Sequence, residues 1–114
     1  MRQLESQLQQ ACHTWMKVMH PNITSFSIPN EGLRSVKTAA RLKANGMMSG
    51  VADYFVMHKN IFYCGLFIEF KVGKNKQTPS QKAFEQRCIS NYYKYKVVRS
   101  TDEFIEIINN YLND

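Results

Sequence analysis

The sequence has little of what several common protein classes require. Its three cysteines, Cys12, Cys64 and Cys88, are far apart and lack the close pairs that zinc sites use. It has five glycines and no glycine-rich phosphate loop. No apolar run approaches the ~20 residues that cross a bilayer, and the first residues do not resemble a signal peptide. We therefore expect a soluble protein in a reducing, intracellular compartment.

Basic residues outnumber acidic ones. Fifteen Lys and Arg residues against nine Asp and Glu residues give a net charge of +6 and a pI near 9.3. Such a balance favours a polyanionic partner such as nucleic acid. The hydrophobic content of 44% and aromatic content of 12% are typical of a globular protein, and the length predicts one domain over residues 1–114.

Three charged residues interrupt two apolar runs between residues 50 and 71. Asp53 lies in the first run, and Glu69 and Lys71 lie in the second. Burying an unpaired charge costs several kcal/mol, so these groups must pair with one another or the carboxylates must hold a metal ion. Side chains two apart on a strand share a face, which places Phe67, Glu69 and Lys71 together. We favour the interpretation in which the carboxylates hold a metal ion.

The register of this hairpin decides whether Asp53 joins that face. A two-residue turn at Lys59 and Asn60 would place Asp53 opposite Leu66, on the wrong side of the sheet. The connection must therefore hold an odd number of residues, or a bulge, most naturally at Gly65, must shift the pairing. The sequence predicts one of these two arrangements.

The other elements follow from periodicity and from start and stop signals. A helix is predicted over 2–19, a strand over 23–28 and a helix over 33–45 that ends at Asn45 and Gly46. After the 51–71 hairpin, a helix begins at Thr78 and ends near Asn91. The Tyr- and Lys-rich segment 92–96 leads into a strand over 97–99 and then a final helix. Thr78 with Gln81, and Ser100 with Glu103, have capping-box spacing.

Several polar residues have both a purely structural and a functional interpretation. Gln81 suits a helix cap, yet its stripe also faces the sheet beside Lys71. Glu5 is either a solvated carboxylate near a helix N-terminus or a further acidic group of the site. His13 and His20 are ordinary surface histidines rather than a metal pair. Five cations either lie on a solvated helix face and in a solvated loop or contact DNA phosphates. They are Arg34, Lys37, Arg41, Lys74 and Lys76.

Taken together, Asp53, Glu69-Phe70-Lys71 and Gln81 resemble the PD-(D/E)XK nuclease superfamily, and within it the VRR-NUC (virus-type replication-repair nuclease) domain. The similarity covers nearly the whole chain and includes segments 28–34, 50–53 and 78–81. Ala52 stands where the superfamily often has proline. The resemblance implies an α/β fold with a central mixed sheet flanked by helices, in the order α-β-α-β-β-α-β-α.

The same resemblance implies a chemistry. Asp53, Glu69 and the backbone carbonyl of Phe70 would bind Mg²⁺ or Mn²⁺, with Glu5 as a further candidate. Oxygen ligands suit these ions, and the absence of suitably placed Cys and His ligands argues against zinc. Lys71 would orient the attacking water and stabilise charge in the transition state, and Gln81 would position that water or Lys71.

The implied activity is cleavage of structured DNA in the cytoplasm of a bacterial or phage-infected host cell. Short members of the family resemble homodimeric Holliday-junction resolvases, so a homodimer acting on four-way junctions in DNA repair and recombination is expected. Two alternatives are a flap or branched-DNA repair nuclease and a non-catalytic DNA-binding module that keeps the fold. The intact set of charged residues argues against the non-catalytic module.

Overall fold

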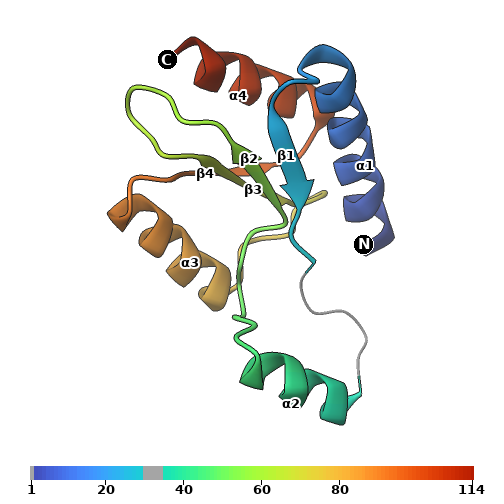
Figure 1. The fold of residues 1–114 in the computed structure, drawn as a ribbon. Helices are drawn as coiled ribbons and strands as arrows, with labels where there is room; N and C mark the ends of the chain where they lie inside the picture. Colours follow the sequence, from blue (N-terminus) through green and yellow to red (C-terminus); the bar gives the residue numbers. More distant parts are fainter. Residues whose placement is uncertain (1, 30–34) are drawn as a thin grey trace.

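The structure is a computed structural model that describes residues 2–29 and 35–114. Four helices and four strands are found in the described residues, in the predicted order (Figure 1). They are α1 (Arg2–Met19), β1 (Thr24–Ser27), α2 (Val36–Ala44), β2 (Tyr54–Met57), β3 (Leu66–Phe70), α3 (Pro79–Ser90), β4 (Lys94–Val98) and α4 (Thr101–Asn113). None of the described helices is long and apolar enough to span a membrane.

The strands form one mixed sheet in the order β1-β2-β3-β4. The β1–β2 and β2–β3 pairs are antiparallel, and the β3–β4 pair is parallel. In the β2–β3 pair, Tyr54 lies opposite Ile68 and Val56 lies opposite Leu66. Residues 57–65, an odd number, therefore connect the last paired positions, as the sequence predicts. The predicted strand over 97–99 begins earlier, because Lys94, Tyr95 and Lys96 already pair with β3.

Helices cover the two faces of the sheet unequally (Figure 1). Alternate residues of β3, Leu66, Ile68 and Phe70, pack with residues of α1 and α4 in one large apolar cluster that includes Met16 and Phe104. Helix α3 lies on the opposite face, where a smaller cluster is found. The division follows from the two-residue period of a strand, and it places Phe67 and Glu69 toward α3.

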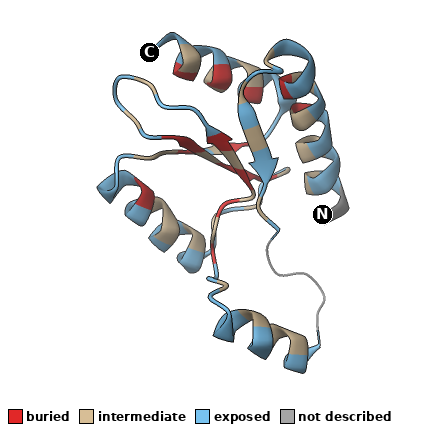
Figure 2. Cartoon of the chain, viewed as in Figure 1, coloured by how far each residue is buried: buried red, intermediate tan, exposed pale blue. Residues whose placement is uncertain are grey.

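Helix α2 covers neither face. It lies apart from the sheet and has no buried residue, and Val36 is 88% exposed (Figure 2). Ser35 caps its start by accepting a hydrogen bond from the Thr38 backbone N–H, and Asn45 is its C-cap. The described positions of the apolar stripe predicted for this helix, Val36 and Ala40, are therefore exposed rather than packed in a core. Its predicted first turn, with Leu33 and Arg34, lies outside the described residues.

Candidate active site

The β2–β3 register brings Asp53 and Glu69 to the same side of the sheet. Continuing the observed pairing by one step places Asp53 opposite Glu69, and Asp53 keeps the ladder through its N–H, which donates to the Ile68 carbonyl over 3.0 Å. The Phe70 N–H donates to Asp53 Oδ2 over 2.8 Å, which holds the carboxylate against the next strand. Opposite faces for these two residues would have contradicted the predicted metal site.

The side chain of Gln81 serves the helix cap and the site at once. Its Oε1 accepts from the Thr78 backbone N–H over 2.9 Å, completing the capping box at the start of α3. Its Nε2 donates to Glu69 Oε2 over 3.1 Å. Since the cap occupies the oxygen of the amide, the NH₂ group must face Glu69. The two interpretations of Gln81 therefore coexist.

Glu69 and Lys71 are both buried, with 3% and 8% of their surfaces exposed. Glu69 Oε1 is shielded from solvent and has no hydrogen-bond partner. Leaving a buried carboxylate oxygen unpaired costs free energy, so native structures seldom do so without a reason such as an ion. The Lys71 ammonium lowers the pKa of both Asp53 and Glu69 through its charge.

The protonation equilibria of the two carboxyl groups are displaced. Burial, reinforced by the neighbouring Asp53 charge, raises the pKa of Glu69 to about 9. Burial also raises the pKa of Asp53, against the lowering effect of the Phe70 N–H and Lys71. Two carboxylates kept close in a desolvated site resist ionising together. A bound cation would reverse this balance and favour both charged forms.

Glu5 reaches the site from α1. Its charge raises the pKa of both Asp53 and Glu69, and its Oε2 accepts a hydrogen bond from Asn75 Nδ2 over 3.3 Å. It nevertheless does not join the two carboxylates closely enough to form a three-ligand cluster, and the described residues contain no group of three His, Cys, Asp or Glu side chains suited to a metal. The sequence does not predict this contact of Asn75, although the loop that carries Asn75 is among the segments predicted to contact DNA.

The donor set fits a hard divalent cation better than zinc. Asp53 and Glu69 are oxygen ligands, and the orphaned Oε1 of Glu69 is a buried acceptor without a donor. Mg²⁺ usually takes only one or two protein carboxylates and keeps waters and substrate oxygens in its other positions, so two suffice. The Phe70 carbonyl and Glu5 remain predicted ligands.

A close backbone approach ties the Asp53 segment to the start of α3. Gly50 has a φ of +86°, and a Cβ placed on it would lie 2.3 Å from the Ser80 carbonyl oxygen. No side chain fits there, so only glycine lets the two segments touch. Ala52, directly before Asp53, is fully buried beside Cys88 and Tyr95 in the smaller apolar cluster.

The predicted DNA-contacting cations lie in two places. Lys37 and Arg41 are exposed on α2, and Lys74 and Lys76 are exposed in the loop between β3 and α3, on either side of Asn75. Arg34 lies outside the described residues. No interaction found among the described residues joins Lys37, Arg41, Lys74 or Lys76 to Asp53 or Glu69. The role of the five cations in DNA binding stays a prediction.

Comparison with known proteins identifies the fold. No family model and no curated protein matches the chain. Among solved structures, one described as a "VRR_NUC domain protein" matches with a TM-score of 0.82 and 24% sequence identity, covering 96% of this chain and 88% of that one. The fold is therefore that of a VRR_NUC domain, and the predicted α-β-α-β-β-α-β-α arrangement is confirmed.

Proposed function

We propose that the protein is a metal-dependent endodeoxyribonuclease that hydrolyses phosphodiester bonds in branched DNA. The observation that carries the proposal is the half-buried Asp53 beside the buried Glu69, whose unpaired Oε1 offers a ligand to a cation, with Lys71 buried two residues further along the chain. The net charge of +6 and the fold of a VRR_NUC domain support a DNA substrate. We place the whole chain, residues 1–114, in one nuclease domain.

In this mechanism Asp53 and Glu69 would hold Mg²⁺, or Mn²⁺ in its place, with the Phe70 carbonyl as a third ligand. The ion supplies Lewis-acid stabilisation of the phosphate and lowers the pKa of a bound water. Lys71 orients the attacking water and compensates the negative charge that develops on the phosphorane. Gln81 holds Glu69 in position through its NH₂ group.

The four-way junction is the substrate that we favour. A homodimer would present two equivalent sites to a two-fold symmetric junction and cut both strands in a paired manner. A flap or other branched DNA would require the same site residues, so the active site alone does not decide between these substrates. The proposed cellular location is the cytoplasm of a bacterial or phage-infected host cell.

The test compares labelled four-way junction, flap, duplex and single-stranded DNA with Mg²⁺, with Mn²⁺ and with chelator. The key variant is Lys71→Met, which keeps the buried stem and removes the ammonium. Lys59→Met, in the loop between β2 and β3 and away from Asp53, is the matched control. We expect paired, metal-dependent nicks in the junction, lost in Lys71→Met and kept in the control.

Other outcomes would redirect the proposal. Cutting of flaps in preference to junctions would identify a repair nuclease, and a monomer in sedimentation experiments would remove the symmetry argument. Tight DNA binding without cutting under any metal would mean that the chain is a non-catalytic binding module.

A further inference from the structure

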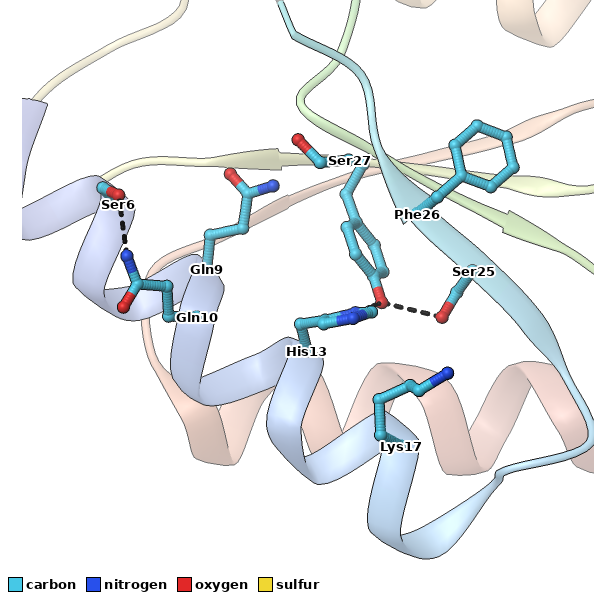
Figure 3. Close-up of a pocket in the computed structure, with 9 residues that line it drawn as sticks. Ser6, Gln9, Gln10, His13, Lys17, Ser25, Phe26 and Ser27 are labelled. Atoms are coloured by element: carbon cyan, nitrogen blue, oxygen red, sulfur yellow. Dashed lines mark hydrogen bonds between the residues drawn. The ribbon is translucent and has the colours of Figure 1, made fainter.

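A groove lined mainly by residues with polar side chains lies between α1 and β1 (Figure 3). Its volume is about 440 Å³. Nine residues line it, of which one is a cation, Lys17, and none is an acid. The polar ones are Ser6, Gln9, Gln10, His13, Lys17, Ser25, Ser27 and the hydroxyl end of Tyr54.

The floor of the groove is held by a hydrogen-bonded triad. The hydroxyl of Tyr54, a residue only 1% exposed, lies 2.6 Å from His13 Nδ1 and 2.7 Å from Ser25 Oγ. Figure 3 shows these bonds joining α1 to β1 across the groove. His13 is therefore half-buried and bonded rather than the surface histidine that its sequence context predicts. The triad fixes the distance between the two walls.

The groove is joined to the Asp53 segment through the backbone. Gln9 Nε2 donates to the Asp53 carbonyl over 3.4 Å, whereas the side chains of Asp53 and Tyr54, which are neighbours in the chain, point to opposite faces of the sheet. Glu5, Gln9, His13 and Lys17 recur every four residues, so they follow one side of α1 away from the site. The path from Glu5 to Lys17 is ~18 Å long, at 1.5 Å per residue. Phosphates of one strand recur every 3.4 Å along the duplex axis, so a duplex lying along α1 would place about five of them over this path.

We propose that this groove holds the backbone of one DNA strand, three to five nucleotides from the cleaved bond, with Lys17 and the Ser25 and Gln9 groups as phosphate contacts. Hydroxyls, amides and ammonium groups are the usual partners of phosphate oxygens. No acid lines the groove itself, and Glu5 lies beyond its lining residues. Figure 3 shows Gln9 and Lys17 extending from α1 toward β1, where Ser27 and Ser25 lie. The proposal rests on the proposed nuclease function for the identity of the ligand.

The experiment measures DNA binding on a Glu69→Gln background, which leaves the substrate uncut under the proposed mechanism. Lys17→Gln is compared with Lys59→Gln, an exposed lysine in the loop at the other end of β2. We expect Lys17→Gln to weaken binding about fivefold at low salt and to reduce the salt slope by about one, and Lys59→Gln to do neither.

Neutral methylphosphonates, placed one at a time at phosphates one to seven from the cut, locate the contact. A substitution at the phosphate nearest Lys17 should weaken binding to the lysine form and leave the Lys17→Gln form unaffected. Inorganic phosphate and a nucleoside monophosphate are titrated alongside. Binding of these small anions through Lys17, with no methylphosphonate effect, would overturn the strand path in favour of a mononucleotide site.

The two proposals fail in different ways. If the unmodified protein cuts DNA but Lys17→Gln matches Lys59→Gln, the groove proposal is wrong and the nuclease stands. If no DNA is cut but Lys17→Gln, unlike Lys59→Gln, weakens DNA binding and lowers the salt slope, the nuclease proposal is wrong and the groove still binds a DNA backbone.

Discussion

The two faces of the sheet, built from the same strands, differ in what they bury. Toward α1 and α4, Ile68, Met16 and Phe104 have no exposed surface and belong to a large apolar cluster. Toward α3, the apolar cluster around Cys88 and Tyr95 is smaller, and Glu69 and Lys71 are buried beyond it. Under the proposed function, residues of β3 on one face serve stability and those on the other face serve catalysis. Changes on the first face should unfold the protein, and changes on the second should inactivate a folded one.

The largest effect is expected on the apolar face. Phe104→Ala removes a ring that contacts Trp15, Tyr54 and Phe70 and should lower the free energy of unfolding by about 3–5 kcal/mol. Denaturant unfolding followed by circular dichroism measures it. Any cleavage activity per folded molecule should be unchanged, and a folded but inactive variant would contradict the separation of the two faces.

Glu69→Gln tests the other face. Cleavage should fall more than ~100-fold, since even partners of metal ligands contribute 10- to 100-fold. The free energy of unfolding should rise in the same variant when no metal is bound. The folded-state pKa of Glu69 is raised to about 9, so the native state holds a proton that the unfolded chain releases near 4.5. Stability of the unmodified protein without metal therefore falls as pH rises between these values, and the variant should be more stable at pH 8.

Mg²⁺ should reverse the order of stability of the unmodified protein and Glu69→Gln. At a metal concentration of 100 times its Kd, the unmodified protein should gain about 2.7 kcal/mol and Glu69→Gln far less. Thermal melts at pH 5 and pH 8, with Mg²⁺ and with chelator, measure both effects. Equal melting temperatures for the two proteins at pH 8 in chelator would show that Glu69 is not held protonated by its surroundings.

A smaller effect separates the two helix caps. Thr78 accepts from the Gln81 N–H over 3.2 Å, and Ser100 accepts from the Glu103 N–H over 3.1 Å. Thr78→Ala and Ser100→Ala should each lose about 1 kcal/mol of stability. Only Thr78→Ala should also slow cleavage, by about tenfold, because it loosens the helix turn that orients Gln81 toward Glu69.

The comparison of caps is decided by cleavage rates measured at a temperature where both variants are folded. Equal activity would mean that Gln81 does not depend on the cap for its position. The predicted second capping box is only half formed, because Glu103 Oε1 accepts from the Arg99 N–H and not from that of Ser100. Ser100→Ala is therefore a matched control in which the cap oxygen is lost far from Glu69.

The smallest stability change is expected on α2, which covers neither face. Lys37→Gln combined with Arg41→Gln should alter the free energy of unfolding by less than about 0.5 kcal/mol, because no residue of this helix is buried. DNA affinity should nevertheless fall, with a salt slope reduced by about two if both residues contact phosphates. Unchanged affinity across salt concentrations would assign the two cations to a solvated face.

The sequence predicts most of the fold because its signals are local. Helix caps, strand alternation and the need to unite Asp53 with Glu69 lead to the observed element order and to the odd connection in the hairpin. Gly65, the predicted bulge position, is instead a close-packed site, where a Cβ would lie 2.7 Å from the Phe55 ring. That constraint comes from a neighbouring strand and has no local signal.

The missed features are contacts between segments distant in the sequence. Asn75 bonds with Glu5 across 70 positions, and Tyr54 bonds with His13 across 41. A tyrosine in an alternating strand and a histidine on a helix have no pattern that links them. Gln81 was ambiguous for a related reason, since one glutamine satisfies both a local cap and a distant carboxylate.

The contact between Gly50 and Ser80 affects how distant relatives of this chain can be identified. A sequence motif built from the charged residues would require Asp53, Glu69 and Lys71 and would allow any residue at position 50. Yet any added side chain at Gly50 would meet the Ser80 backbone, so a relative that keeps this junction must keep glycine there. A search pattern that requires Gly three positions before the aspartate should therefore exclude chance matches to the carboxylates and lysine. Aligned sequences of this fold with larger residues at that position would show that the contact between Gly50 and Ser80 is dispensable.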